Sequence, residues 1–151
     1  MTDIRTGFDY DLGYTCFLIS EIAFMTNNKL RDVIGYFSYK DISNIYNNAP
    51  VFHCEDSESV SEKFISFLDV KDGKFKHSEV LTSIELGDIL GRLIYDLYQE
   101  GVIDDKVKGI LDVFNSDFIE VIENVDAGLY WQSAEVIYDY YLTGNLDWLE
   151  M

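Results

Sequence analysis

The stretch TSIELGDILGRLIYDLYQEG, residues 82–101, decides the fold class, because its apolar residues recur in steps of three and four. On a helix this spacing forms one apolar stripe, made of Leu86, Ile89, Leu90, Leu93, Ile94, Leu97 and Tyr98. The opposite side carries the polar residues Asp88, Arg92 and Asp96. We therefore predict an amphipathic helix from about residue 85 to residue 99.

Both ends of this helix and two glycines inside it carry further information. Thr82 followed by Glu85 is typical of a capping box, and Gly101 follows the last periodic residue, as a helix stop does. Gly87 and Gly91 each weaken the helix by about 1 kcal/mol relative to alanine. We therefore expect another helix to approach closely on the side of these glycines.

Apolar residues with the same spacing predict further helices on both sides of this one. These helices cover residues 12–25, 30–37, 42–46, 107–114, 118–125 and 131–142. Ser116 is placed to cap the helix that follows it. The only proline, Pro50, lies in a turn-rich stretch that separates two helical sets. The whole chain, 1–151, is thus predicted to form one compact, mainly α domain, with Trp148 and Leu149 docking the tail.

The segment 64–77 fits two different structures. Ser59 and Glu62 have the spacing of a capping box, which predicts a helix from residue 63 to residue 68. The residues on both sides of Asp72-Gly73 predict instead a short β-hairpin, because this dipeptide tolerates the positive φ of a type I′ turn. The sequence leaves both structures open.

Composition and charge exclude several classes of protein. The chain of 151 residues is 48% hydrophobic, which is too apolar for a disordered chain. No window holds the roughly 18 to 20 uninterrupted apolar residues of a membrane span. The first residues show no secretory signal, so we expect a cytoplasmic protein. A formal net charge of -17 repels nucleic acid and anionic membranes, so we expect a basic protein partner, no nucleic acid and no membrane.

The sequence shows no motif for phosphate binding, nucleotide binding or covalent catalysis. His53-Cys54-Glu55-Asp56 contains metal-binding residue types, but adjacent side chains do not readily point at one ion. Around Gly73, the apolar residues Leu68 and Val70 occupy positions where a calcium loop needs oxygen ligands. We therefore expect no cofactor, no bound metal and no enzymatic activity, with a catalytic carboxylate pair as the open alternative.

Acidic residues are concentrated in the second half of the chain. Residues 85–151 contain fifteen acidic and three basic residues, a balance of -12, against -5 for the first 84 residues. Four carboxylates follow at three-residue steps from Asp117 to Asp126, which on a helix forms either a docking ridge or a solvated face. The nearby tyrosines occupy too many sides of the next helix for all of them to be buried. We expect a partner to bind at Asp112, Asp117, Glu120, Glu123, Asp126, Tyr138 and Tyr141.

In its size, its acidic helix and the adjacent tyrosines, the chain resembles bacterial toxin-immunity proteins of the contact-dependent or colicin type. The resemblance is one of overall character without a shared motif, so no functional residue is transferred from it. It implies a tight one-to-one complex that blocks a cationic toxin domain, typically a nuclease. Two other functions fit the same features: a DNA mimic or phage-type inhibitor of a nucleic-acid-binding protein, and a small acid–base enzyme with one carboxyl of raised pKa.

Overall fold

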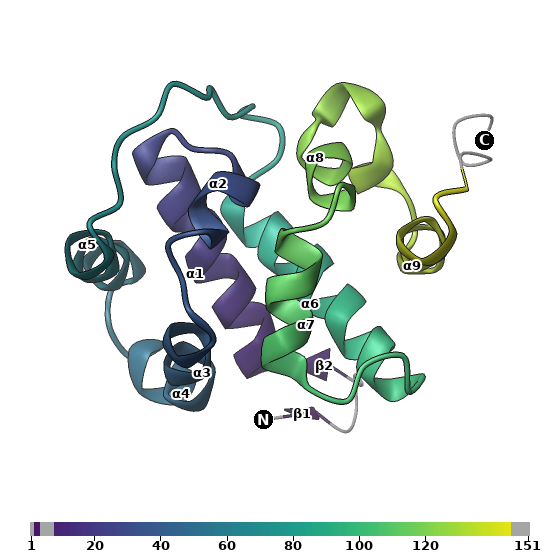
Figure 1. Cartoon of the computed structure of the whole chain (residues 1–151), viewed down its shortest axis with the longest axis horizontal. Helices are drawn as coiled ribbons and strands as arrows, with labels where there is room; N and C mark the ends of the chain where they lie inside the picture. Colours follow the sequence, from purple (N-terminus) through teal and green to yellow (C-terminus); the bar gives the residue numbers. More distant parts are fainter. Residues whose placement is uncertain (1, 4–7, 146–151) are drawn as a thin grey trace.

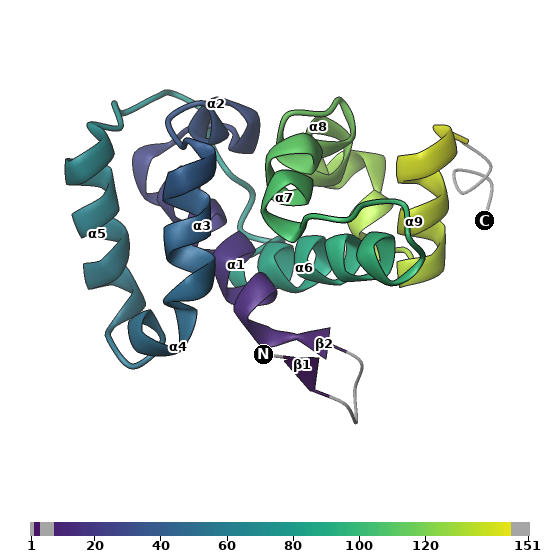
Figure 2. The ribbon, with the colours of Figure 1, turned by 60° about the horizontal axis from the view of Figure 1, so that its bottom comes forward.

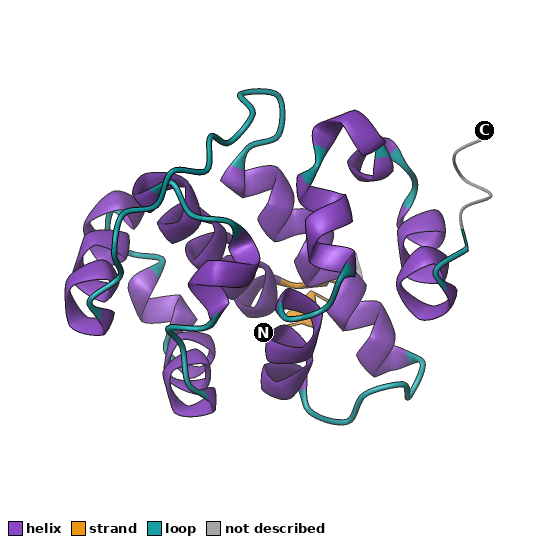
Figure 3. Ribbon diagram, turned by 45° about the horizontal axis from the view of Figure 1, so that its top comes forward, coloured by secondary structure: helices purple, strands orange, loops and turns teal. Residues whose placement is uncertain are grey.

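The computed structural model describes residues 2–3 and 8–145, and these residues are mainly helical (Figures 1 and 3). In chain order the elements are β1 (Thr2–Asp3), β2 (Phe8–Asp9), α1 (Tyr10–Thr26), α2 (Leu30–Ile34), α3 (Tyr39–Asn47), α4 (Ala49–Phe52), α5 (Ser57–Leu68), α6 (Ser83–Gln99), α7 (Lys106–Phe114), α8 (Phe118–Glu123), the 3-10 helices η1 (Val125–Ala127) and η2 (Leu129–Trp131), and α9 (Ala134–Thr143). The short strands β1 and β2 pair antiparallel. The prediction of a mainly α domain is confirmed, while Trp148 and Leu149 lie outside the described residues.

The centre of the molecule is the pair α1 and α6, whose contact is the most extensive between any two elements. Buried residues occupy nearly every side of α1, because α2, α3, α5 and α6 all pack against it. A Cβ atom at Gly87 would lie 2.6 Å from Cβ of Phe17 and 2.8 Å from its Cα. The close approach expected at this glycine is therefore confirmed, and its partner is α1.

The remaining helices are arranged around this pair. Figure 2 shows α6 crossing the molecule, with α3 and α5 towards one end and α9 at the other. The core is continuous across these elements, and its largest fully buried side chains include Leu12, Leu18, Ile22, Leu90, Ile94 and Phe114. One side of α6 therefore packs on the core, and its polar side faces outward.

The predicted ends of the later helices are confirmed in part. The capping box at α6 is present, with the backbone N–H of Glu85 donating to Oγ1 of Thr82 at 3.1 Å. Gly144 ends α9 with a φ of 68°, in the left-handed region that favours glycine. The cap predicted at Ser116 is wrong: the N-cap residue of α8 is Asp117, and the Ser116 hydroxyl donates to the carbonyl of Val113 at 2.6 Å.

Of the two structures open for residues 64–77, the helix is confirmed for its first part. α5 begins six residues before the predicted start at residue 63, because the carboxylate of Asp56 accepts the backbone N–H of Ser59 at 3.3 Å. Ser59 therefore lies inside the helix and does not cap it. Val60 and Phe64 are the buried apolar residues of this helix.

The hairpin, the other structure left open for this segment, is not formed, because Gly73 and Phe75 bond to the end of α1. The backbone N–H of Gly73 donates to the carbonyl of Thr26, and that of Phe75 to the carbonyl of Asn27, each at 2.8 Å. A Cβ atom at Gly73 would clash with the side chain of Asn28. Gly73 is therefore required for this close contact between distant segments, and the Asp72-Gly73 signal does not mark a hairpin turn.

Candidate functional site

The four carboxylates predicted to form one ridge lie in different surroundings. Asp117 and Glu120 are exposed at the start of α8, where a guanidinium nitrogen of Arg31 lies 3.0 Å from Oδ1 of Asp117 and 3.6 Å from Oε1 of Glu120. Asp126 is exposed on η1, beyond the end of α8. Glu123 is buried, with 8% of its surface exposed. The predicted ridge is therefore reduced to two carboxylates that share an arginine.

Glu123 faces inward because it satisfies a helix end. Its Oε2 accepts the backbone N–H of Leu30, the first residue of α2, at 3.0 Å. Nδ1 of His77 lies 3.9 Å from the same oxygen, beyond hydrogen-bond distance. Burial raises the pKa of Glu123 to about 7, although the Leu30 N–H lowers it. Burial lowers the pKa of His77, whose ring stacks on Phe24. Glu123 therefore supports the fold and does not belong to an exposed ridge.

The two tyrosines predicted at the partner surface face different neighbours. Tyr141 is half-buried and packs edge-on against Phe118, with ring centroids 5.3 Å apart. Its pKa is raised by burial and then by Asp112, so these two predicted residues lie near each other. Tyr138 is also half-buried, and its pKa is raised by burial and then by Glu100, the residue that follows α6. Tyr138 therefore lies near acidic residues at the end of α6, whereas Tyr141 packs against α8.

Tyr138 lines one of three adjoining hollows along α6, which together we name the α6 groove. Their volumes are about 400 Å³ beside α9, 210 Å³ in the middle and 510 Å³ beside α1. The hollows adjoin because the first two share Arg92 and Ala134, and the last two share Asp88. Residues of α6 and its C-cap line all three hollows: Ile84, Asp88, Arg92, Asp96 and Glu100 follow each other at four-residue steps and wind gradually around the helix. At about 1.5 Å rise per residue they span about 24 Å along the helix axis.

Carboxylates dominate the charge of the α6 groove. They belong to Glu55, Asp56, Asp88, Asp96, Glu100, Glu135 and Asp139. Among the described lining residues, Arg92 is the only lysine or arginine, and its Nε lies 3.1 Å from both carboxylate oxygens of Asp96. Glu55 pairs with Lys63 outside the groove. The other five carboxylates form no ion pair with a described residue, so the groove has a strongly negative potential.

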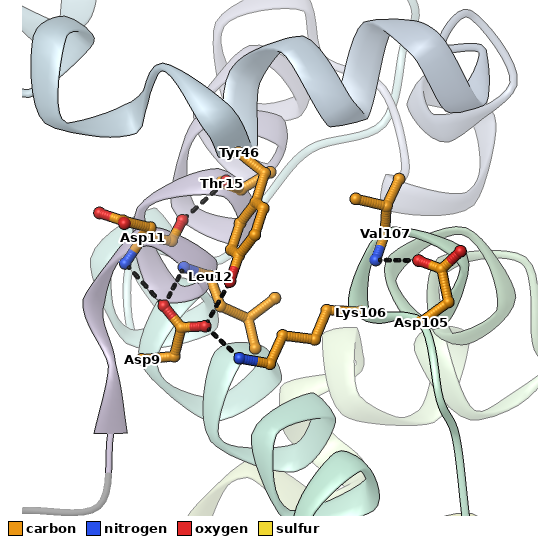
Figure 4. Close-up of polar contacts among 8 residues, drawn as sticks. All are labelled: Asp9, Asp11, Leu12, Thr15, Tyr46, Asp105, Lys106 and Val107. Atoms are coloured by element: carbon orange, nitrogen blue, oxygen red, sulfur yellow. Dashed lines mark hydrogen bonds and ion pairs between the residues drawn. The ribbon is translucent and has the colours of Figure 1, made fainter. Parts of the chain in front are cut away.

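The buried polar groups around Asp9 stabilise the fold. Oδ1 of Asp9 caps α1 by accepting the N–H groups of Asp11 and Leu12, while Oδ2 accepts from Tyr46 at 2.6 Å and from Lys106 at 2.8 Å (Figure 4). Burial raises the pKa of Asp9, but the hydrogen bonds from Lys106 and Tyr46 more than offset it and hold the pKa below its usual value. This cluster ties α1 to α3 and α7 and lines none of the three hollows.

The α6 groove could not be predicted from the sequence, although one of its signals is present there. Asp88, Arg92 and Asp96 were recognised as the polar side of a helix, which is normally a solvated surface. What makes this side concave is the position of α9 and of the segment around His53, and neither is encoded in the periodicity of α6. The ring of His53 stacks on Tyr14, with centroids 5.2 Å apart.

Across residues 2–3 and 8–145, no three histidine, cysteine, aspartate or glutamate side chains gather in an arrangement able to hold a metal ion. No helix within the same ranges has both the length and the apolar character needed to cross a membrane.

Known proteins provide no family for this chain: no family model matches it, and searches of curated proteins and of solved structures found no match.

Proposed function

We propose that this protein is an immunity-type inhibitor, which binds a basic toxin domain through the α6 groove and blocks it. The observation that supports this most is the lining of the groove, where five carboxylates have no ion pair within the described residues. Their mutual repulsion is relieved when lysine and arginine residues of a partner enter the groove. Charge complementarity of this kind speeds association and excludes acidic partners.

The shape of the groove favours a protein partner. The three hollows follow α6 over about 24 Å of its axis, which exceeds the reach of one side chain and suits a helix or an extended segment. Tyr138 lies half-buried among the carboxylates, and tyrosine supplies contact area with two side-chain torsions only. Once desolvated by a partner, such a ring is expected to slow dissociation.

The test is a coexpression experiment. If a secreted protein is encoded beside the gene for this chain, its C-terminal domain is expressed in a sensitive host, alone and together with this chain. We expect the domain to stop growth alone, and this chain to restore growth and to form a one-to-one complex. The immunity function is wrong if no such toxic domain is encoded there or if coexpression does not restore growth.

Matched variants test the role of the groove. Glu100→Lys combined with Glu135→Lys reverses two unpaired groove charges and is expected to abolish protection. Glu58→Lys combined with Glu62→Lys reverses two exposed charges on α5, outside the groove, and is expected to protect fully. Equal protection by the two double variants would place the binding surface elsewhere on the molecule.

A further inference from the structure

The hollow beside α1, with a volume of about 510 Å³, differs from the other two because it has an aromatic wall. Tyr10, Tyr14 and Phe17 line it from one side of α1. One face of the Tyr14 ring stacks on the ring of His53, with an angle of 18° between the two ring planes. Gly13 lines the hollow as well. Flat aromatic surfaces in a hollow of this size suit a ligand group that stacks.

Three carboxylates share this hollow with the aromatic rings. They belong to Glu55, Asp56 and Asp88, and no lysine or arginine is among the described residues that line it. Burial raises the pKa of Asp88, and the nearby Glu85 raises it further. Asp88 forms no ion pair with any residue that the structure describes, and a cationic group in the hollow would provide a counter-charge.

The hydroxyl of Tyr14 is an independent sign of a ligand. It is buried and is the one such side-chain polar atom without a hydrogen-bond partner in the described part of the chain. The residue is 8% exposed, and the carboxylates of Glu21 and Glu55 lie near enough to raise its pKa further after burial, to about 12. A buried hydroxyl without a partner destabilises a fold by about 1 to 3 kcal/mol. A phenylalanine would avoid this loss, so the hydroxyl at this position calls for a partner from outside.

Guanidinium is the cation that fits these three observations together. It is planar and stacks on aromatic rings, it pairs with carboxylates through two N–H groups, and its remaining N–H groups can donate to a hydroxyl oxygen. Placed between Tyr14 and Glu55, the guanidinium would donate an N–H to the hydroxyl oxygen of Tyr14, and its positive charge would pair with the carboxylate of Glu55. A lysine ammonium lacks the flat surface and holds its water more strongly.

We propose that the hollow beside α1 binds the guanidinium group of one arginine side chain of the basic partner. This inference rests on the proposed function, because the arginine belongs to the protein that the α6 groove binds. The arginine enters at the Asp88 end of the groove, while the rest of the partner follows α6 towards Tyr138. Binding of this arginine side chain provides specificity, whereas the carboxylates near α9 attract the basic partner as a whole.

The site can be tested without the partner, by nuclear magnetic resonance of the full chain labelled with 15N. The ligands are N-acetyl-arginine amide, the lysine analogue, and the citrulline analogue, which has the shape of arginine without its charge. We expect the arginine ligand to shift the amide signals of Gly13, Phe17 and Ser57 and to saturate. The lysine ligand should bind at least threefold more weakly, and the citrulline ligand should cause no saturable shift. Equal binding of citrulline would overturn the proposal.

Two variants separate ligand contact from folding. Tyr14→Phe removes the unpartnered hydroxyl and is expected to weaken arginine binding at least threefold while the melting temperature stays equal or rises. Asp88→Asn should weaken binding by a similar factor. The controls are Tyr130→Phe and Glu62→Gln, which lie outside the hollow and should bind as the wild type does. Unchanged binding by Tyr14→Phe and Asp88→Asn would refute the site.

The result of this binding experiment is independent of the result of the coexpression test. Growth protection without arginine binding would leave the proposed function in place and remove the arginine anchor. Arginine binding without growth protection would remove the toxin partner and leave a guanidinium site. In the complex itself, Tyr14→Phe is expected to speed dissociation and to leave association unchanged.

Discussion

The ammonium of Lys106 lies 2.8 Å from Oδ2 of Asp9, a residue 97 positions earlier in the chain. Asp9 is 1% exposed, so removal of the cation would take the Lys106 ion pair away from a buried carboxylate. We therefore predict that Lys106→Met lowers the free energy of unfolding by about 3 kcal/mol, as measured by urea denaturation. Lys108→Met, an exposed change on the same helix, should alter it by less than about 0.5 kcal/mol.

The same pair predicts a response to acid. Because the folded state holds the pKa of Asp9 below its usual value, this group stabilises the fold above the unfolded pKa. That contribution is lost as the pH falls through the lowered pKa. Lys106→Met removes the main cause of the lowering, so its unfolding free energy should change less between pH 5 and pH 2 than that of the wild type. Parallel curves for the two proteins would contradict this account.

Glu123 predicts the opposite dependence on pH. Its pKa is raised to about 7 in the folded state, so the folded state binds its proton more tightly than the unfolded state. The resulting stability is present below the unfolded pKa and is lost as the pH rises through about 7. Glu123→Gln keeps an acceptor for the Leu30 N–H without a charge. We expect its stability relative to the wild type to increase by about 2 to 3 kcal/mol between pH 4 and pH 8.

The comparison with Glu123→Gln also controls for His77. Burial lowers the pKa of His77, which makes the protein more stable as the pH rises towards the ordinary histidine value. This contribution opposes that of Glu123, but it is present in both proteins and largely cancels in their difference. A difference that does not change with pH would show that the carboxyl of Glu123 titrates normally.

Gly87→Ala tests the contact between the two central helices. Alanine favours a helix by about 1 kcal/mol over glycine, but its Cβ would lie 2.6 Å from Cβ of Phe17. We predict a net loss of about 2 kcal/mol or more in calorimetric or urea unfolding, since the backbones must separate. Gly35→Ala is the control, because its added Cβ meets only the carbonyl of Asp32 at 3.4 Å. That variant should be close to neutral.

Charge reversal in the groove is expected to act on association. With the purified partner, Glu100→Lys combined with Glu135→Lys should slow association about tenfold at low salt and flatten its salt dependence. Asp117→Lys should have a smaller effect, because Arg31 already neutralises part of that surface. Stopped-flow measurements at two salt concentrations distinguish the cases. An equal effect at both surfaces would mean that net charge alone, and not the groove, determines the rate.

Tyr138 and Tyr141 are expected to respond differently to truncation. Tyr138→Ala should weaken partner binding by about 2 kcal/mol through faster dissociation, because this ring lines the groove. Tyr141→Ala should mainly lower the melting temperature of the free protein, because its ring packs against Phe118. Surface plasmon resonance and thermal melts on both variants provide the comparison. If Tyr138→Ala loses stability and keeps its dissociation rate, Tyr138 belongs to the core.

Local signals were sufficient to predict most of the helices. The helix around residues 85–99 could be predicted because its stripe, its capping box at Thr82 and its glycine stop all lie within twenty residues. Residues 64–77 could not, because the conformation after α5 is determined by bonds from Gly73 and Phe75 to the end of α1. The Asp72-Gly73 signal for a turn was weaker than these contacts between distant segments.

The candidate site was less predictable than the fold. Three-residue steps correctly place Asp117 and Glu120 together, but they do not show that α2 covers Glu123 or that Arg31 reaches both exposed carboxylates. The α6 groove is made by helices far apart in the chain, so its concave shape exists only after folding. Periodicity identifies the sides of a helix, whereas the site depends on what lies opposite each side.

The pairing of α1 with α6 has a consequence for synthesis of the protein. α1 ends at Thr26 and its main partner ends at Gln99, so α1 leaves the ribosome long before that partner is complete. At roughly 5 to 20 residues per second, the delay is roughly 4 to 15 s. During that time a helix that is apolar on nearly every side can pair only with the short helices α2 to α5. Translational pauses that delay the appearance of α6 after α1 should therefore increase aggregation and chaperone binding of the nascent chain.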